Sequence, residues 1–301
     1  MNHLKAVIDL GTNTARLLVG HIDPSGHIQP LLVKRWITRL GGGFSRETGL
    51  SSEARIRTIN ALVDFVHEIE KHDPSSIRAV ATSAVRDAIN GKSFCEDVFS
   101  ETGIKIEILS SRDEGLITLH GVMAGLDLLS GDLMVFDVGG GSTEYTVAVD
   151  KEMIFTHSLP LGVVRLTEGK HNRAQMDDKI SRELESLRIR LQEKNILDLV
   201  ECSVLVGTAG TATTLAAISM KLEHYDYRLV NGYSLSRGEI EEIFNFLAPM
   251  SPEERIQVPG LEKGREDLII AGIIITLKTM DIFGFNQLIV SDSGLLEGLI
   301  F

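Results

Sequence analysis

The sequence predicts an α/β protein made of two duplicated domains that face each other across a cleft. The main observation is an internal repeat, in which the segment from Ala6 to Thr14 returns as the segment from Met134 to Thr143, with Asp9 and Asp137 lying 128 positions apart. Each copy is an apolar strand that ends in an aspartate and a turn of glycine and hydroxyl residues. The length of 301 residues suits about two domains of ordinary size. We therefore place the domains at residues 1–125 and 126–301, with the boundary near residues 125–132.

The first domain begins as a β-hairpin and then alternates helix with strand. The hairpin's second strand runs from Arg16 to Gly20. Apolar residues at helical spacing predict a helix next, and two apolar runs predict strands at Ile77 to Ala81 and Ile104 to Leu109. The helical stripe consists of Ile56, Ile59, Val63, Val66 and Ile69. The acidic pair Asp113 and Glu114 then begins the helix that ends the domain.

The second domain follows the same order. Its hairpin is completed by a strand from Tyr145 to Val149, and a later strand covers Val204 to Val206. Between these strands, a helix presents one apolar face made of Ile180, Leu184, Leu187 and Leu191. A helix across Leu268 to Asp281, a strand at Leu288 to Val290 and a closing helix from Ser293 complete the chain.

The composition excludes several classes of protein. Hydrophobic residues make up 43% of the chain and charged residues 24%, as in ordinary globular proteins. The two cysteines, Cys95 and Cys202, lie far apart and indicate neither a zinc site nor a disulfide framework, so a reduced cytoplasm is the expected compartment. The longest apolar run, Leu268 to Leu277, has about half the length that a bilayer requires, so we expect no membrane partner.

The net charge of −12 argues against binding of DNA or RNA, and its distribution is uneven. Residues 126–301 carry a net charge of −11, whereas residues 1–125 carry −1. The first half contains a basic stretch made of Lys34, Arg35, Arg39, Arg46, Arg55 and Arg57. A solvated surface and a track for a polyanionic substrate both explain this stretch.

The two repeated turns suit phosphate chemistry. Glycines let backbone N–H groups approach an anion, hydroxyl side chains add donors, and an aspartate can hold a divalent cation that bridges to phosphate oxygens. Two such loops, at residues 9–14 and 137–144, would bind one phosphate chain from both sides. A tight hairpin turn explains either loop taken alone, but the duplication favours phosphate binding.

A third loop, from Val206 to Thr213, joins a strand to a helix and offers N–H groups and the positive end of a helix dipole to an anion. It lacks the Gly-Lys-Ser/Thr ending of a Walker A motif, and a glycine turn used only for packing is the alternative explanation. The pair Asp113 and Glu114 is likewise explained by the helix dipole alone. Glu144, at the start of a strand, is similarly ambiguous.

Several motifs in order along the chain resemble the exopolyphosphatase/guanosine pentaphosphate phosphohydrolase (Ppx/GppA) family. They are Val7 to Thr14, Thr82 to Asn90, Ser111 to Glu114, Asp137 to Glu144, Gly207 to Thr211, Pro259 to Leu261 with Arg265 and Asp267, and Val290 to Gly294. The resemblance implies the actin, Hsp70 and sugar-kinase (ribonuclease H-like) fold for both domains. Two departures from the family pattern are Gly115 after the acidic pair and Leu296 in place of a usual arginine.

The resemblance implies hydrolysis of terminal phosphoanhydride bonds in inorganic polyphosphate or guanosine pentaphosphate. Glu114 would be the catalytic base that deprotonates the attacking water, and Mg²⁺, or Mn²⁺ in its place, would be held by Asp9, Asp137 and Glu144. The phosphates would be bound by Gly11, Thr12, Asn13, Arg39, Arg86, Gly139, Gly140, Gly141, Ser142, Thr143, Gly207, Gly210 and Thr211. Homodimerisation is a further expectation that rests on the resemblance alone.

Two other functions use similar residues. An ATP-dependent kinase on the same fold has the same paired loops, and a non-catalytic sensor could bind guanosine tetra- or pentaphosphate without turnover. Glu114, with the segment Thr82 to Asn90 upstream, favours the hydrolase over the kinase, and the presence of the carboxylates Glu114, Asp137 and Glu144 disfavours the sensor. The chain resembles a short form of the family, without the extra helical domains of larger members. This likeness and the acidic second half predict a preference for short polyphosphates.

Overall fold

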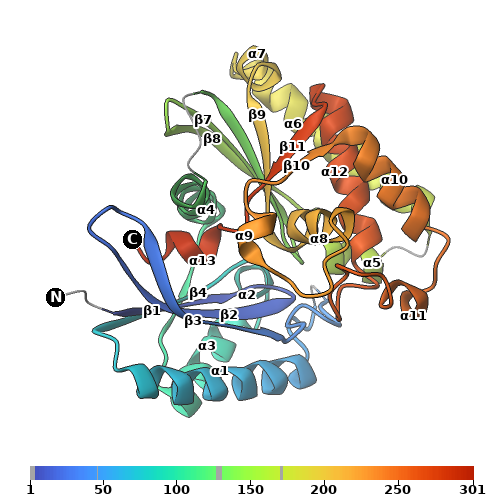
Figure 1. Cartoon of the computed structure of the whole chain (residues 1–301). Helices are drawn as coiled ribbons and strands as arrows, with labels where there is room; N and C mark the ends of the chain where they lie inside the picture. Colours follow the sequence, from blue (N-terminus) through green and yellow to red (C-terminus); the bar gives the residue numbers. More distant parts are fainter. Residues whose placement is uncertain (1–3, 46, 127–130, 170–171) are drawn as a thin grey trace. The chain divides into compact units, whose positions relative to one another are not determined.

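The structure is a computed structural model that describes residues 4–45, 47–126, 131–169 and 172–301. The chain divides into two compact units (Figure 1). The first unit comprises Met1–Gly125 together with Ser293–Phe301, and the second comprises Leu126–Asp292. No described helix has the length and apolar character that crossing a membrane requires.

The first unit is built on a five-stranded sheet in the order β3-β2-β1-β4-β5. Its strands are β1 (Lys5–Leu10), β2 (Thr14–Ile22), β3 (Ile28–Ile37), β4 (Ser76–Ala81) and β5 (Ile106–Ile108). Its helices are α1 (Ser52–His72), α2 (Ser83–Arg86), α3 (Gly91–Thr102), α4 (Ser111–Gly125) and α13 (Leu295–Gly298). β1 pairs antiparallel with β2 and parallel with β4. The predicted hairpin is therefore present, and β3, which the sequence analysis did not predict, extends it to three strands.

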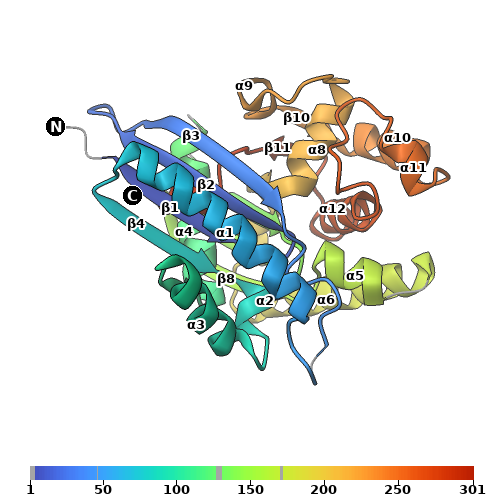
Figure 2. The ribbon, with the colours of Figure 1, turned by 90° about the horizontal axis from the view of Figure 1, so that it is seen from below.

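Strand β1 serves both faces of this sheet, because successive side chains point to opposite faces. Ala6 and Ile8 are buried in the cluster that includes the apolar side of α1, which Figure 2 shows lying along the sheet. Val7 is buried in a second cluster together with Leu296 and Ile300 from the end of the chain. Asp9 shares the face of Val7.

Helix α1 is present as predicted, and its predicted buried face is confirmed only in part, since Ile69 is buried and Ile59 and Val66 are partly buried against the core. The hydroxyl of Ser51 caps the helix by accepting a hydrogen bond from the N–H of Ala54. Ile56 in the predicted stripe is 61% exposed. The buried residues are Ala54, Thr58, Ala61, Leu62, Phe65 and Ile69. The two small residues and the threonine let the helix approach the sheet closely, so the packed face is rotated away from Ile56.

The second unit is built on a six-stranded sheet in the order β10-β11-β9-β6-β7-β8. Its strands are β6 (Leu133–Val138), β7 (Thr143–Val149), β8 (Glu152–Leu159), β9 (Val204–Thr208), β10 (Ser234–Ser236) and β11 (Gln287–Val290). Its helices are α5 (Val163–Gly169), α6 (Arg173–Glu193), α7 (Leu197–Glu201), α8 (Ala209–Ser219), α9 (Tyr227–Val230), α10 (Arg237–Leu247), α11 (Pro252–Arg255) and α12 (Ile269–Phe283). β6 pairs antiparallel with β7 and parallel with β9, which repeats the arrangement around β1.

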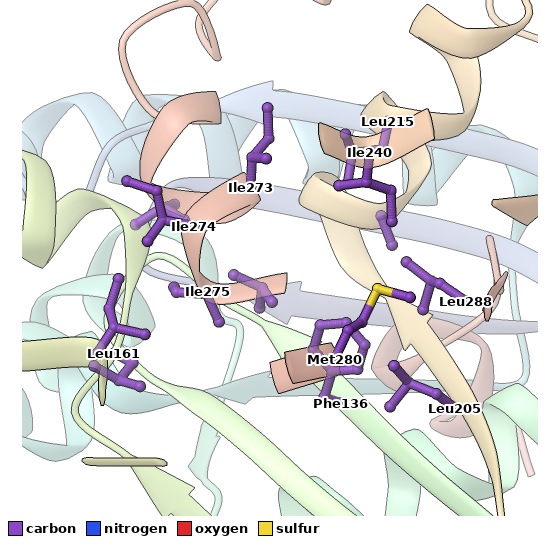
Figure 3. Close-up of a cluster of buried hydrophobic side chains, with 14 of the residues drawn as sticks. Phe136, Leu161, Leu205, Leu215, Ile240, Ile273, Ile274, Ile275, Met280 and Leu288 are labelled. Atoms are coloured by element: carbon purple, nitrogen blue, oxygen red, sulfur yellow. The ribbon is translucent and has the colours of Figure 1, made fainter. Parts of the chain in front are cut away.

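The core of the second unit forms around α12, which is apolar on most of its surface. Ile273, Ile274 and Ile275 are consecutive and all buried, so the helix packs on several sides at once. Figure 3 shows these side chains among Phe136, Leu205 and other residues of the sheet and the neighbouring helices. On α6, the predicted apolar face of Ile180, Leu184, Leu187 and Leu191 is confirmed, since all four side chains are buried.

The end of the chain differs from the predicted division at residue 126. Residues 293–301 belong to the first unit rather than the second. Leu295 and Leu299 are buried there, and the ammonium of Lys5 donates to the carbonyl of Ile300 at 2.7 Å. The physical reason is that α13 covers the apolar face of the first sheet on the side of Val7.

Candidate functional site

The repeat places an aspartate opposite a different residue in each unit. In the first unit, Asp9 on β1 lies directly opposite Arg16 on β2. In the second unit, Asp137 on β6 lies directly opposite Glu144 on β7. Opposed side chains in an antiparallel pair share one face of the sheet at about 5 Å between Cβ atoms. One unit therefore pairs opposite charges at this position, and the other brings two carboxylates together.

Asp9 forms an ion pair within its own unit. Its Oδ2 accepts hydrogen bonds from Nε of Arg16 at 3.2 Å and from Nη2 at 3.0 Å. The Asp9 side chain is 10% exposed. The assignment of Asp9 to a metal ion stays a prediction, and in the structure its charge has a guanidinium partner.

Glu144 is held by two hydroxyl groups. Its Oε1 accepts hydrogen bonds from Ser142 Oγ and from Ser158 Oγ, each at 2.7 Å. Only 3% of the residue is exposed. Asp137 lies beside Thr208, where the third loop begins on the neighbouring strand β9. The second and third predicted loops therefore meet at one edge of the second sheet.

The donor set of Asp137 and Glu144 fits a hard divalent cation. Mg²⁺ commonly binds one or two carboxylates and completes its shell with water and substrate phosphate. Within the described residues, no group of three or more His, Cys, Asp and Glu side chains is arranged to hold a metal ion. Asp137 and Glu144 are only two carboxylates, so water and substrate phosphate would complete the coordination shell of an ion that they hold.

The glycine turn of the second unit rests on the beginning of α5. The carbonyls of Gly139 and Gly140 accept hydrogen bonds from the N–H groups of Val163 and Val164 at 3.0 and 2.9 Å. A side chain at Gly162 would overlap the backbone of this turn. Two carbonyl oxygens that would repel an anion are thereby engaged by α5. Thr143 Oγ1 donates to the carbonyl of Leu161, so it also fixes the turn.

The residues of the third loop have different neighbours. A Cβ at Gly207 would press on Leu288 and Phe136, so this glycine is required by core packing. The guanidinium of Arg265 occupies the space where a side chain of Gly210 would lie, and the side chain of Thr211 packs against Gly272 of α12. Arg265 therefore brings a guanidinium to this loop, and its Nε is paired with Oε2 of Glu262 at 3.0 Å.

The first loop is tied to its neighbours within the first unit. The N–H of Gly11 donates to the carbonyl of Thr14 at 3.0 Å, and the hydroxyls of Thr12 and Ser83 lie 3.1 Å apart. The N–H of Arg39 donates to the carbonyl of Asn13 at 2.8 Å. Within the described part of the chain, the buried Oδ1 of Asn13 has no hydrogen-bond partner. This loop and Arg39 therefore form one local cluster.

Glu114 lies in the first turn of α4, as predicted, and is 6% exposed. Its Oε2 lies 2.7 Å from Nη1 of Arg86, which comes from α2. The structure thus brings together the predicted base and a predicted phosphate-binding arginine of the same unit.

Sequence reasoning missed three residues that hold the predicted ones. They are Arg16 beside Asp9, Ser158 beside Glu144, and Arg57, which donates to the carbonyls of Thr38 and Arg39. The repeat offset of 128 would have revealed the first, because position 16 in the first copy corresponds to position 144 in the second. The other two carry no local signal, since their partners are distant along the chain.

The chain is similar to known phosphatases along most of its length. Residues 19–301 match the Ppx/GppA phosphatase family. A bifunctional 3-dehydroquinate synthase/phosphatase of Fusobacterium nucleatum is 32% identical over 314 residues, which include 99% of this chain; the chain spans 46% of that protein's length. Exopolyphosphatase 2 of Mycobacterium tuberculosis is 29% identical over 308 residues, covering 98% of this chain and 96% of the relative.

Solved structures agree with this similarity. The Aquifex aeolicus PPX-GPPA enzyme has a TM-score of 0.80 and 33% identity, and the match covers 99% of this chain and 98% of that one. An exopolyphosphatase from Cytophaga hutchinsonii has a TM-score of 0.89 at 23% identity, covering 99% of this chain and 96% of that one, and supports the fold alone. The predicted α/β fold of two related halves is confirmed.

Proposed function

We propose a substrate and a mechanism for this chain from the premise that it belongs to the Ppx/GppA phosphatase family and is a phosphohydrolase. The substrate is inorganic polyphosphate, and the reaction releases its terminal phosphate by attack of water. The relatives named exopolyphosphatase, one of which the match covers almost completely, support this substrate. The observation that carries the proposal is the cross-strand pair of carboxylates, Asp137 and Glu144, at the edge where two glycine loops meet.

Phosphoryl transfer depends mainly on positioning and on neutralising charge around the phosphorus. In the second unit, Asp137 and Glu144 would hold Mg²⁺, or Mn²⁺ in its place. The bound ion would supply charge neutralisation at the phosphate oxygens. The hydroxyls of Ser142 and Ser158 keep Glu144 in place, and the guanidinium of Arg265, paired with Glu262, lies beside Gly210.

In the first unit, Glu114 acts as the general base. The proton of the attacking water passes to its carboxylate while the new O–P bond forms and the terminal phosphoanhydride bond breaks. Arg39, held against the loop of Asn13, contributes charge for the phosphates. A kinase would instead need a second substrate with an acceptor hydroxyl or carboxylate.

The test is a phosphate-release assay without any acceptor molecule. Long polyphosphate, short polyphosphate and guanosine pentaphosphate are compared at equal terminal-phosphate concentration with Mg²⁺ present. We expect release from polyphosphate. Release from guanosine pentaphosphate alone would assign the nucleotide as substrate. Tight nucleotide binding without release would indicate a sensor, and phosphate transfer that appears only with an acceptor would indicate a kinase.

A variant of Glu114 tests the mechanism. Glu114→Gln keeps the size and hydrogen-bonding capacity of the side chain but removes the base, so turnover should fall by about 10² or more while substrate binding persists. Substrate binding is measured at equilibrium on the same variant. Retention of more than about a third of the turnover would show that Glu114 only serves the helix dipole.

A further inference from the structure

Arg86 and Glu114 form an ion pair that is largely shielded from water inside the first unit. Arg86 is the last residue of α2, and Glu114 lies in the first turn of α4. Nη1 of Arg86 lies 2.7 Å from Oε2 of Glu114, and the two side chains are 20% and 8% exposed. Charged hydrogen bonds of this length are among the strong ones, and low exposure strengthens them further.

The guanidinium is anchored at a second point. The same Nη1 donates to the carbonyl of Leu109 at 3.1 Å. Leu109 is buried, and its own N–H donates to the carbonyl of Ala81 at the end of β4. Arg86 therefore links the carboxylate of Glu114 to the connection between β5 and α4, and through it to the sheet. Its Nε lies 3.9 Å from Oδ1 of Asp87, which is the weaker of its contacts with acids.

We propose that Arg86 is a positioning residue, which fixes the carboxylate of Glu114 for taking the proton of the attacking water. This inference rests on the proposed function, in which Glu114 is the base. A general base must be held within hydrogen-bond reach of the water, and small displacements are costly. The role differs from the phosphate contact that the family resemblance implies for Arg86. A guanidinium already paired with a buried carboxylate has its charge compensated, and its attraction for a phosphate is correspondingly weaker.

The two roles predict different kinetic effects. Loss of a positioning residue lowers kcat and leaves KM nearly unchanged, whereas loss of a phosphate contact raises KM. For Arg86→Gln we expect kcat to fall by about 10-fold to 100-fold with KM within about threefold of the unchanged chain. Arg86→Lys keeps the charge but replaces the planar, pre-organised guanidinium by an ammonium on a flexible stem, so its kcat should lie between those of the unchanged chain and Arg86→Gln.

A double-variant cycle with Glu114→Gln tests whether the two residues act as one unit. If Arg86 acts through Glu114, Arg86→Gln added to Glu114→Gln should lower kcat by no more than about threefold further. The double variant also removes both charges together, so no uncompensated carboxylate is left buried. Circular dichroism of each variant verifies that it is folded, and the double variant keeps the comparison available if Arg86→Gln alone does not fold.

Arg78 provides a matched control in the same unit. Its exposed side chain on β4 pairs with the exposed side chain of Glu107 on β5 at 3.2 Å, so Arg78→Gln also breaks an Arg–Glu pair but should leave kcat and KM unchanged. A KM that rises more than about tenfold with kcat unchanged, or fully additive losses in the cycle, would overturn the positioning role and leave the proposed function standing. Absence of phosphate release by the unchanged chain would overturn both.

Discussion

At the scale of single residues, we expect substitution of the two repeated aspartates to have different effects on Mg²⁺ dependence, because their cross-strand partners carry opposite charges. Asp137→Asn removes one anionic ligand from a hard cation, so the Mg²⁺ concentration for half-maximal phosphate release should rise by about tenfold. Asp9→Asn should leave this concentration unchanged, since Oδ2 of Asp9 is paired with Arg16. Mg²⁺ titrations of both variants measure the difference. An equal rise for Asp9→Asn would show that it contributes to the metal site.

Residue contacts were predictable only where the repeat revealed them. The offset of 128 positions relates Asp9 to Asp137 and Arg16 to Glu144, so the contrast between the two units can be deduced from the sequence. The contact between Arg86 and Glu114 cannot be deduced in this way, because the two residues lie on separate helices, α2 and α4. Nothing in the local pattern of either helix specifies how the other approaches.

At the scale of elements, α13 can pack closely against α4 because glycines stand at the points of contact. A Cβ at Gly121 would overlap the carbonyl oxygen of Gly294, and a Cβ at Gly298 would overlap that of Ile117. Gly121→Ala should therefore lower the free energy of unfolding by about 1–3 kcal/mol, because the two helices must separate. Urea unfolding measures the change. Gly169→Ala, where nothing lies near the added methyl group, is the control, and an equal loss there would contradict the packing explanation.

Strand β8 contains a group that couples stability to pH. Burial lowers the pKa of His157 below its ordinary value of 6.5, and Arg190 lowers it further against the opposing effect of Glu183. The unfolded chain therefore binds this proton more readily than the folded chain. The contribution of neutral His157 to the free energy of unfolding is therefore complete above about pH 6.5, and it is lost as the pH falls below that value. His157→Gln removes the titration.

Urea unfolding of the unchanged chain and of His157→Gln at about pH 7.5, 6 and 5 measures this effect. The advantage of the unchanged chain over the variant should shrink as the pH falls. An advantage that is constant over this range, or that grows toward acid pH, would contradict a lowered pKa at His157.

Apolar spacing predicted α6 well and the face of α1 poorly, for a physical reason. On α6, the four aliphatic side chains of the predicted face are all buried, and Ile189, which was not assigned to that face, is 54% exposed. On α1, the residues that pack include Ala54, Thr58 and Ala61, whose small size lets the helix approach closely. A pattern that counts only large apolar residues cannot detect these small ones, and the predicted stripe also left out the buried Leu62 and Phe65. The same limit applies to β3, whose side chains are mostly exposed.

At the scale of the whole molecule, the duplication was predictable, but the packing of residues 293–301 on the first unit was not. Each hairpin repeats a pattern of neighbouring residues, and such local patterns can be identified in a sequence. Leu295 and Leu299 pack on a sheet formed almost 300 residues earlier, beside Val7 and Leu18. Their spacing indicates an amphipathic helix but does not identify the sheet that it covers.

The length of polyphosphate that the chain can bind depends on its accessible cations. Binding of many phosphate units needs an extended row of accessible cations, yet three cations of the basic stretch of the first unit are engaged in internal contacts, and Arg46 lies outside the described residues. Lys34 pairs with Glu68 at 2.7 Å, Arg55 pairs with Asp97, and Arg57 donates to two backbone carbonyls. Residues 126–301, with a net charge of −11, are a poor surface for a long polyanion.

We therefore expect preference for short polyphosphates, low processivity, and a KM that rises with salt as charges are screened over about 8 to 10 Å. A series of chain lengths, compared at equal terminal-phosphate concentration and followed on gels, measures this preference. The low-processivity mechanism produces a ladder of intermediate lengths that shortens with time, because each chain is released after a few cleavages. Complete digestion of single long chains without intermediates would contradict it, since that result requires a cationic track that holds the chain between successive cleavages.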